Sequence, residues 1–213
     1  CIICLQAFAM DRQQRKGALT QRQENRQHTV NCDTLDWCTV DINGNRYQQT
    51  MVVPGTSFTM VKQHSDKTAS KNAKIFKKLK EKLEALTDPG GNYKVFACRH
   101  DPGSEFEGEF AETLAEMHLI NEKGMAKRHH PVVEGKHKVI EFTATALCLT
   151  ALGCNHEMAD LLHGDAADWA VALINHSEVT EEQKEMHKTA YQQQTGTDKQ
   201  LSDAGKVYTW GSL

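Results

Sequence analysis

An Asn-Gly pair at positions 43 and 44 follows residues 36–42, in which polar and apolar residues roughly alternate, and precedes residues 46–53, which favour a second strand. Asn-Gly favours a tight hairpin turn, because both residues tolerate positive φ angles. A second turn signal, Pro54-Gly55, precedes residues 56–61, which are rich in Thr, Phe and Val. The sequence therefore predicts a three-stranded antiparallel meander over residues 36–61.

Helical spacing of apolar residues follows this region. Residues 66–86 repeat Ala, Phe and Leu at that spacing, behind Ser65 or Asp66 as a candidate N-cap. Three later stretches share the pattern: residues 105–120, 155–174 and 180–193. Residues 138–152 favour either a buried strand, from their β-branched start, or a helix, from the Ala and Leu that follow. Residues 207–210 favour a last strand or an aromatic anchor.

Together these patterns predict an α+β fold, with an antiparallel β-sheet or sandwich core packed with three to four helices. The polar, Arg- and Gln-rich stretch near the N-terminus indicates a separate arm over residues 1–28. We expect residues 29–213 to form a single α+β domain, since their number suits one large domain.

Composition limits the function classes. The net charge of −3 provides no overall basic field to attract nucleic acid. No apolar stretch reaches the roughly 20 residues that a membrane span needs. Cys1 and Cys4 form a CxxC pair without a second such pair, so the seven cysteines favour mostly free thiols in a reducing, intracellular compartment. A disulfide between Cys32 and Cys38 and a secreted protein stay open as alternatives.

A candidate metal site lies in the polar cluster after the apolar run 139–154. His156 and Asp160 are four positions apart and Asp160 and His163 three, so on a helix they share a face. His and carboxylate side chains at this spacing can hold a divalent metal and activate a water molecule. The complete candidate set is His137, His156, Asp160, His163 and Asp165. Its layout resembles the HD-type metal phosphohydrolases, except that Gly164 interrupts the adjacent His-Asp pair of that family.

Basic residues suggest a second candidate interface. Residues 66–86 carry seven lysines, and four of them indicate a nucleic-acid contact: Lys67, Lys71, Lys74 and Lys78. Arginines between positions 12 and 26 could contribute from the arm. A solvated helix face explains the lysines equally well, because Glu81 and Glu84 dilute the positive charge.

Three short motifs occur in an order that resembles the cypovirus polyhedrins, the self-crystallising matrix proteins of insect-virus occlusion bodies. They are the hairpin at residues 41–47, the segment 128–135, and Gly153–His156 with Asp160, followed by about sixty residues to the end. The second and third motifs lie closer together here than in that family. The resemblance implies a β-sandwich flanked by helices that assembles as trimers in a lattice.

From this resemblance we expect a self-assembling structural protein, a viral matrix, occlusion-body or capsid component, without catalytic residues or a cofactor. Its partner would be itself, in a homo-oligomer or lattice, and it would reside in the host cytoplasm or the virus particle. Two alternatives are a metal-dependent, HD-like phosphohydrolase and a nucleic-acid-binding protein.

Overall fold

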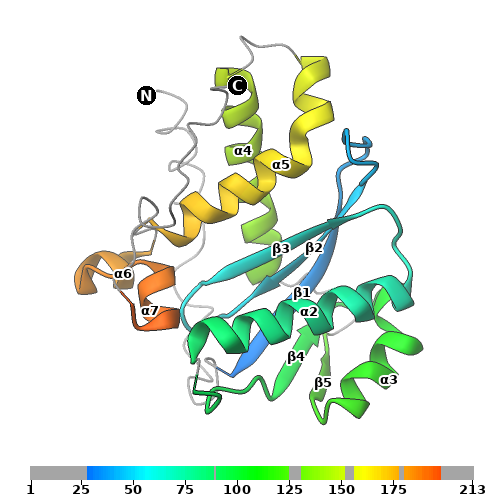
Figure 1. Cartoon of the computed structure of the whole chain (residues 1–213), viewed down its shortest axis with the longest axis vertical. Coiled ribbons are helices and arrows are strands. Elements are labelled where there is room, and N and C mark those ends of the chain that lie inside the picture. Colours follow the sequence, from blue (N-terminus) through cyan, green and yellow to red (C-terminus); the bar gives the residue numbers. More distant parts are fainter. Residues whose placement is uncertain (1–27, 89, 125–130, 152–155, 178–179, 198–213) are drawn as a thin grey trace.

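The structure, a computed structural model, describes residues 28–88, 90–124, 131–151, 156–177 and 180–197, with the backbone alone at Pro131 and His156. Five strands form one mixed sheet in the order β3-β2-β1-β4-β5 (Figure 1). Their bounds are β1 Thr29–Asp36, β2 Tyr47–Val52, β3 Thr59–His64, β4 Ala97–His100 and β5 Ile120–Lys123. The first three strands pair antiparallel, whereas β4 and β5 run parallel to β1.

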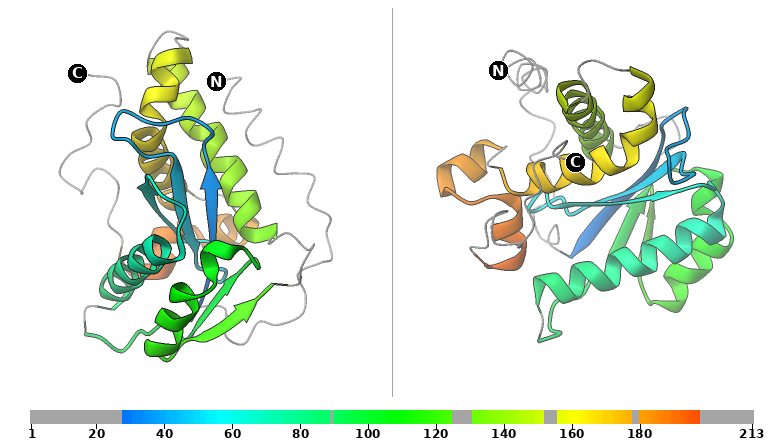
Figure 2. Two further views of the ribbon diagram at one scale, coloured as in Figure 1. Left: turned by 90° about the vertical axis from the view of Figure 1, so that its right-hand side faces the viewer. Right: turned by 45° about the horizontal axis from the view of Figure 1, so that its top comes forward.

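Helices cover both faces of the sheet (Figures 1 and 2). On one face lie α2 (Ala69–Thr87) and α3 (Glu109–Glu116), and on the other lie α4 (Pro131–Ala151) and α5 (His156–Asn175). The short helices α6 (Glu181–Met186) and α7 (Ala190–Thr195) pack at one end. The predicted α+β fold is confirmed. Its sheet is mixed rather than wholly antiparallel because α3 connects β4 to β5 as a crossover, which makes this pair parallel.

The predicted meander is present as β1, β2 and β3, but its first strand precedes the expected position. Residues 37–46 form a loop instead. Asp41 holds this loop, since its Oδ1 accepts hydrogen bonds from the backbone N–H groups of Asn43 (2.9 Å) and Asn45 (2.7 Å). The N–H of Ile42 donates to the carbonyl of Leu161 on α5 at 2.8 Å. Contacts with α5 and turn hydrogen bonds therefore override the alternating pattern.

Two hydrophobic clusters hold the helices to the sheet. Between the sheet and α2 and α3 lie fully buried Phe76, Phe106 and Phe110. On the other face, Ile140 and Ala144 pack against small residues of α5. Burial of one large apolar side chain contributes roughly 1.5–3 kcal/mol. The stretch 138–152 was predicted as strand or helix, and its described part, residues 138–151, is helical. The buried side chains at positions 140, 144 and 148 recur at helical spacing.

Other elements depart from the predicted bounds. The stretch 105–120 divides into a 3-10 turn, η2 (Ser104–Phe106), and α3, and β5 begins at its end. The stretch 180–193 contains two helices, because His187 adopts a left-handed conformation (φ 50°) and Thr189 caps a new helix. The N-cap of α2 is Thr68, whose side chain accepts from the Lys71 N–H. The expected strand at 207–210 lies outside the described residues, and so does the predicted arm at 1–28 except for its last residue, His28.

The structure bears on the state of Cys32 and Cys38 and on a membrane span. Cys32 is a buried free thiol and Cys38 an exposed one, so no disulfide joins them. Within the described ranges, no helix combines the length and apolar character required to cross a membrane.

Candidate functional site

Two carboxylates lie side by side where β1 and β4 run parallel. Cys32 pairs with His100 in the register of these strands, and one step further along the same register places Asp33 beside Asp101. Side chains alternate between the faces of a sheet, so Asp33 lies on the face opposite the buried Cys32. That face is the one covered by α4 and α5, because Asp33 is paired with Thr50 and Thr50 with Val61, which packs in the α4–α5 cluster.

The environment of Asp33 disfavours its charge. Burial, followed by repulsion from the carboxylates of Asp101 and Glu105, raises the pKa of Asp33 to about 6. The Thr34 N–H, which donates to its Oδ1 at 2.7 Å, and the ammonium of Lys67 act in the opposite direction. The negative charge around Asp33 is therefore larger than the positive charge that nearby side chains supply.

Asp101 contributes an oxygen without a protein partner. Its Oδ1 is buried and accepts no hydrogen bond from the described residues. The backbone around it is fixed, since the Gly103 N–H donates to the Asp101 carbonyl and the Gly124 N–H to the His100 carbonyl, both at 2.8 Å. A Cβ at Gly124 would lie 3.2 Å from Asp101 Oδ1, so glycine leaves room around this oxygen. A buried carboxylate oxygen without a donor fits a cation better than an empty environment.

Glu105 adds a third carboxylate on the turn that follows β4. Its side chain is 10% exposed and forms an ion pair with Lys67 at 2.8 Å. Glycine at position 103 leaves room for this carboxylate, because a Cβ there would lie 2.5 Å from the Glu105 Oε2 and the side chain would have to shift. Phe106 anchors this turn by stacking on His100, with ring centroids 4.8 Å apart.

The first turns of α4 place Glu134 and His137 on the same sheet face as Asp33. His137 Nδ1 lies 3.7 Å from Asp33 Oδ2, and its side chain is 8% exposed. Burial lowers the pKa of His137 to about 4, against the opposing effect of Glu134. The ring is thus neutral at pH 7, and the contact with Asp33 is not an ion pair. Glu134 accepts from Lys138 at 3.0 Å and is 43% exposed.

These side chains do not yet enclose a cation. Across the described residues, no group of three or more His, Cys, Asp or Glu side chains is close enough together to hold a metal ion. Asp33 and Asp101 form the fixed part of the site, and Glu134 would have to turn from Lys138 to join them.

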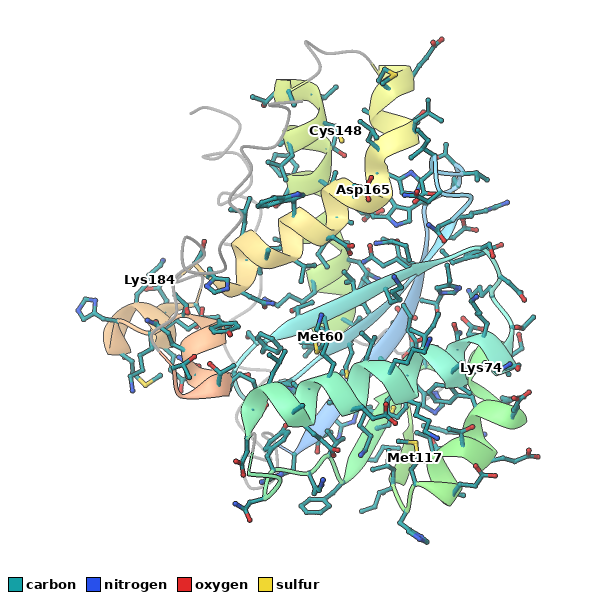
Figure 3. The ribbon with its side chains drawn as sticks, viewed as in Figure 1. Met60, Lys74, Met117, Cys148, Asp165 and Lys184 are labelled. Atoms are coloured by element: carbon teal, nitrogen blue, oxygen red, sulfur yellow. The ribbon has the colours of Figure 1, made fainter. Side chains whose placement is uncertain are left out.

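The metal-ligand set expected from the sequence is not assembled. His137 lies beside Asp33, whereas His163 stacks on Trp37 at 4.9 Å and its Nδ1 is 2.6 Å from the Asp160 carbonyl oxygen. The side chains of Asp160 and Asp165 are exposed on α5, and the helix changes direction near Asp165 (Figure 3). The side chain of His156 lies outside the described part of the chain. Gly164 instead permits close packing, since a Cβ there would lie 2.2 Å from Asp41 Oδ2.

The predicted lysines occupy the exposed side of α2 and the loop before it. Lys67 precedes the helix and reaches Glu105. Lys71, Lys74 and Lys78 follow at spacings of three and four, so they project from one side of α2, and all three are exposed (Lys74 is labelled in Figure 3).

Sequence reasoning missed Asp33, Asp101 and Glu134. Neither Asp33 nor Asp101 was assigned to a site, and Glu134 appeared only within the segment 128–135. In the structure, the three acidic residues lie within one strand, directly after a second strand, and at the start of a helix. Without the parallel pairing of β1 and β4, these three positions have no visible relation.

Comparisons with known proteins show which solved structures share the fold of this chain. No protein-family model and no curated protein matches the chain. Among solved structures, the integrase catalytic core domain of HTLV-2, in complex with magnesium, is similar with a TM-score of 0.57 at 16% identity, over 79% of this chain and 96% of that one. The catalytic core domain of BIV integrase gives 0.55 at 15% identity, over 79% and 93%.

A third match comes from the simian T-cell lymphotropic virus intasome, with a TM-score of 0.60 at 13% identity, over 82% of this chain and 56% of that one. At these identities the likeness shows the fold alone. It is the fold of integrase catalytic cores.

The prediction of a self-assembling matrix or capsid protein is therefore wrong, since the fold of the chain is that of integrase catalytic cores. The expected lack of catalytic residues rested on the same interpretation. The HD-like alternative is set aside with it, because the described members of its ligand set form no group that could hold a metal ion. The polyhedrin resemblance itself stays a prediction, and part of its second motif, residues 125–130, lies outside the described residues.

Proposed function

We propose that this chain is the catalytic core of a divalent-cation-dependent enzyme that cleaves or transfers phosphodiester bonds in nucleic acid. One observation carries the proposal: parallel pairing of β1 and β4 sets Asp33 beside Asp101, where burial and mutual repulsion raise the pKa of Asp33 to about 6. The similarity to integrase cores, one of them in complex with magnesium, supports this assignment.

The residues present fit a divalent cation. Asp101 supplies a buried oxygen without a donor, Asp33 a second carboxylate, and Glu134 a third from the start of α4. Carboxylate oxygens are the ligands that Mg²⁺ and Mn²⁺ prefer. A cation bound there would polarise a phosphoryl oxygen and lower the pKa of a bound water molecule.

The chain's own groups have separate roles. Asp33 is fixed on β1 and Asp101 follows directly after β4, so the two neighbouring strands give the reaction a fixed centre. Lys67 offsets the charge of Glu105 at the edge of this centre. Lys71, Lys74 and Lys78 continue from Lys67 along α2, and we assign them to the substrate's phosphate backbone, outside the reacting atoms.

The test is a cleavage assay on labelled DNA and RNA, single- and double-stranded, with Mg²⁺ or Mn²⁺. Asp101→Asn should lose at least about 10³-fold in kcat and still bind substrate, because it removes charge only at the cation site. Triple replacement of Lys71, Lys74 and Lys78 by Glu should weaken binding and leave kcat at saturating substrate nearly unchanged. It should also reduce, by about 2–3, the magnitude of the slope of the logarithm of the nucleic-acid association constant against the logarithm of salt concentration.

A double variant, Lys184→Glu with Lys188→Glu, serves as the matched control, since Lys184 lies on α6 at the opposite side of the molecule from Lys74 (Figure 3). Its affinity should equal that of wild type at each salt concentration. Absence of cleavage by wild type with every nucleic acid and both cations would contradict the proposed activity. Unchanged affinity of the triple variant for nucleic acid would show that the lysines of α2 do not contact the substrate.

A further inference from the structure

Large apolar side chains gather on the surface where the loop 37–46 meets α5. Val40 is 54% exposed and Ile42 66%, and on α5 Met158 and Leu161 are each 41% exposed. These four residues, called here the apolar patch, are four of the seven large apolar side chains that are exposed in the described part of the chain. Exposed apolar side chains that gather in one place mark a surface that binds something.

The patch is one continuous surface because the loop is fastened to the helix. The Ile42 N–H donates to the Leu161 carbonyl at 2.8 Å, and Trp37 stacks on His163 with ring centroids 4.9 Å apart. Met158 precedes Leu161 by three positions, so both side chains project from one side of α5. The loop lies beside the N-terminal half of α5 in both views (Figures 1 and 2).

Carboxylates lie next to the patch, and the same two elements carry no basic side chain to balance them. Glu157, Asp160 and Asp165 are exposed on α5 within four positions of Leu161. None of the three forms an ion pair with another described residue. Neither residues 37–45 nor α5 contain a lysine or an arginine. A partner of this surface therefore needs apolar side chains together with positive charge.

This requirement excludes two partners. A nucleic acid would bring its phosphate charges to the carboxylates of α5. A second copy of the same patch would bring the same carboxylates, and like charges across an interface disfavour association. The occupant must come from a segment that is both apolar and basic.

Residues 1–16 of the chain have this composition. Residues 1–10 are apolar except for Gln6, and the basic residues Arg12, Arg15 and Lys16 follow, with Asp11 as the one acidic residue of the segment. The apolar stretch matches the patch, and the basic stretch matches the carboxylates beside it.

The chain between this segment and β1 is long enough to reach the patch. The patch lies past the carboxyl end of β1, which has eight residues and spans about 26 Å. Residues 17–28 span up to about 40 Å when extended, and residues 11–28 up to about 60 Å. Residues 1–16 therefore reach the patch of their own molecule.

We propose that residues 1–16 bind the apolar patch of the same molecule. The apolar stretch 1–10 covers Ile42 and Leu161, and the basic residues between positions 12 and 16 lie beside the carboxylates of α5. This contact fastens the start of the chain to the loop 37–46 and to α5. The inference goes beyond the proposed function and does not rest on it.

Photo-crosslinking of the full chain tests the contact directly. The light-activated residue p-benzoylphenylalanine replaces Ile42 in one variant and Leu161 in another, and mass spectrometry of the digested products identifies the cross-linked peptides. Both variants should give cross-links to residues 1–16 in a product of monomer mass. The same residue in place of Ile120, which is 62% exposed on β5, is the control and should not reach residues 1–16.

Hydrogen exchange of the full chain shows which side chains hold the segment. The amides of residues 2–16 should exchange at least about tenfold more slowly in wild type than in the double variant Ile42→Gln with Leu161→Gln. Reversal of charge by Glu157→Lys with Asp160→Lys should also speed their exchange, by a factor that falls at high salt.

The matched control, Ile120→Gln with Met186→Gln, also removes two exposed apolar side chains and should keep the wild-type rates. All these substitutions are at exposed positions, so each variant should fold.

Cross-links from positions 42 and 161 that reach only other parts of the chain, or no cross-links, would overturn the inference. Wild-type amides of residues 2–16 that exchange as fast as those of the double variant would overturn it as well. Cross-links to residues 1–16 found only in a product of dimer mass would also contradict it, since the segment would then come from a second copy. None of these results depends on cleavage of nucleic acid.

Discussion

Asp33→Asn is expected to abolish phosphodiester cleavage and, at pH 7, to stabilise the protein against unfolding. The loss of activity should reach at least about 10³-fold, because the charge that holds the cation is removed. The gain in stability should be about 1–3 kcal/mol. A carboxylate that only supports the fold would lose stability on this substitution. Lost activity together with gained stability therefore indicates a functional carboxylate.

The sign of the stability effect follows from the raised pKa. The pKa of Asp33 is about 6 in the folded chain, against an ordinary 3.8. Between about pH 4 and 6 the folded state binds more protons at this site than the unfolded state, so its contribution to stability falls as pH rises through that window. At 1.36 kcal/mol per pH unit the full shift corresponds to about 3 kcal/mol, and the 26% exposure of the side chain lowers this figure.

The contribution of His137 to the free energy of unfolding changes with pH in the opposite direction to that of Asp33. Because burial lowers its pKa to about 4, its contribution is present above pH 6.5 and is lost as pH falls toward 4. The two slopes partly cancel in wild type, so the informative quantity is the difference in unfolding free energy between wild type and Asp33→Asn. That difference should be small at pH 4 and grow to its full value by pH 7.

Urea unfolding at several pH values, with chelator present, measures this difference. Asp36→Asn is the control on the same strand: the ion pair with Arg46 lowers the pKa of Asp36, so its removal should not stabilise the protein. An Asp33→Asn protein that is less stable than wild type at pH 7 would contradict the assignment of Asp33 to a strained carboxylate pair.

Phe106→Ala is expected to destabilise the fold by about 3–5 kcal/mol, which is the usual cost of truncating a fully buried phenylalanine. Phe106 is 0% exposed, and its ring centroid lies 4.8 Å from that of His100 and 5.0 Å from that of Phe110. The residue also anchors the turn between Asp101 and Glu105. Cation affinity should therefore fall together with stability.

Thermal and urea unfolding measure the first effect, and titration calorimetry the second. Phe96→Ala is the matched control, since Phe96 is 56% exposed and should cost less than about 1 kcal/mol. Equal losses in the two variants would show that the 101–106 turn is not packed as the structure has it.

Local patterns predicted much of the fold. Turn residues and β-branched stretches predicted the meander, and apolar spacing predicted α2, α4 in part, and α5. The first strand was misplaced because residues 37–42 alternate like a strand, yet they are held by the Asp41 side chain and by α5. Such contacts between distant segments leave no periodic trace in the sequence.

The site could not be predicted in the same way. Local spacing favoured His156, Asp160 and His163, because ligands on one helix are visible as a pattern. Asp33 lies on β1 and Asp101 directly after β4. In the sequence, β2, β3 and α2 separate these two strands, and only their parallel pairing brings the two residues together. His137 was identified as a candidate ligand, but it was grouped with the residues of α5 and not with Asp33.

Diffraction from crystals soaked in MnCl₂, recorded at a wavelength where manganese scatters anomalously, tests most directly whether Asp33 and Asp101 hold a cation. We expect an anomalous peak within about 2.2 Å of carboxylate oxygens of both residues. The peak should be absent from Asp33→Asn crystals treated identically. Saturated crystals without a peak between these two carboxylates, or with manganese only at His163 and Asp165, would contradict it.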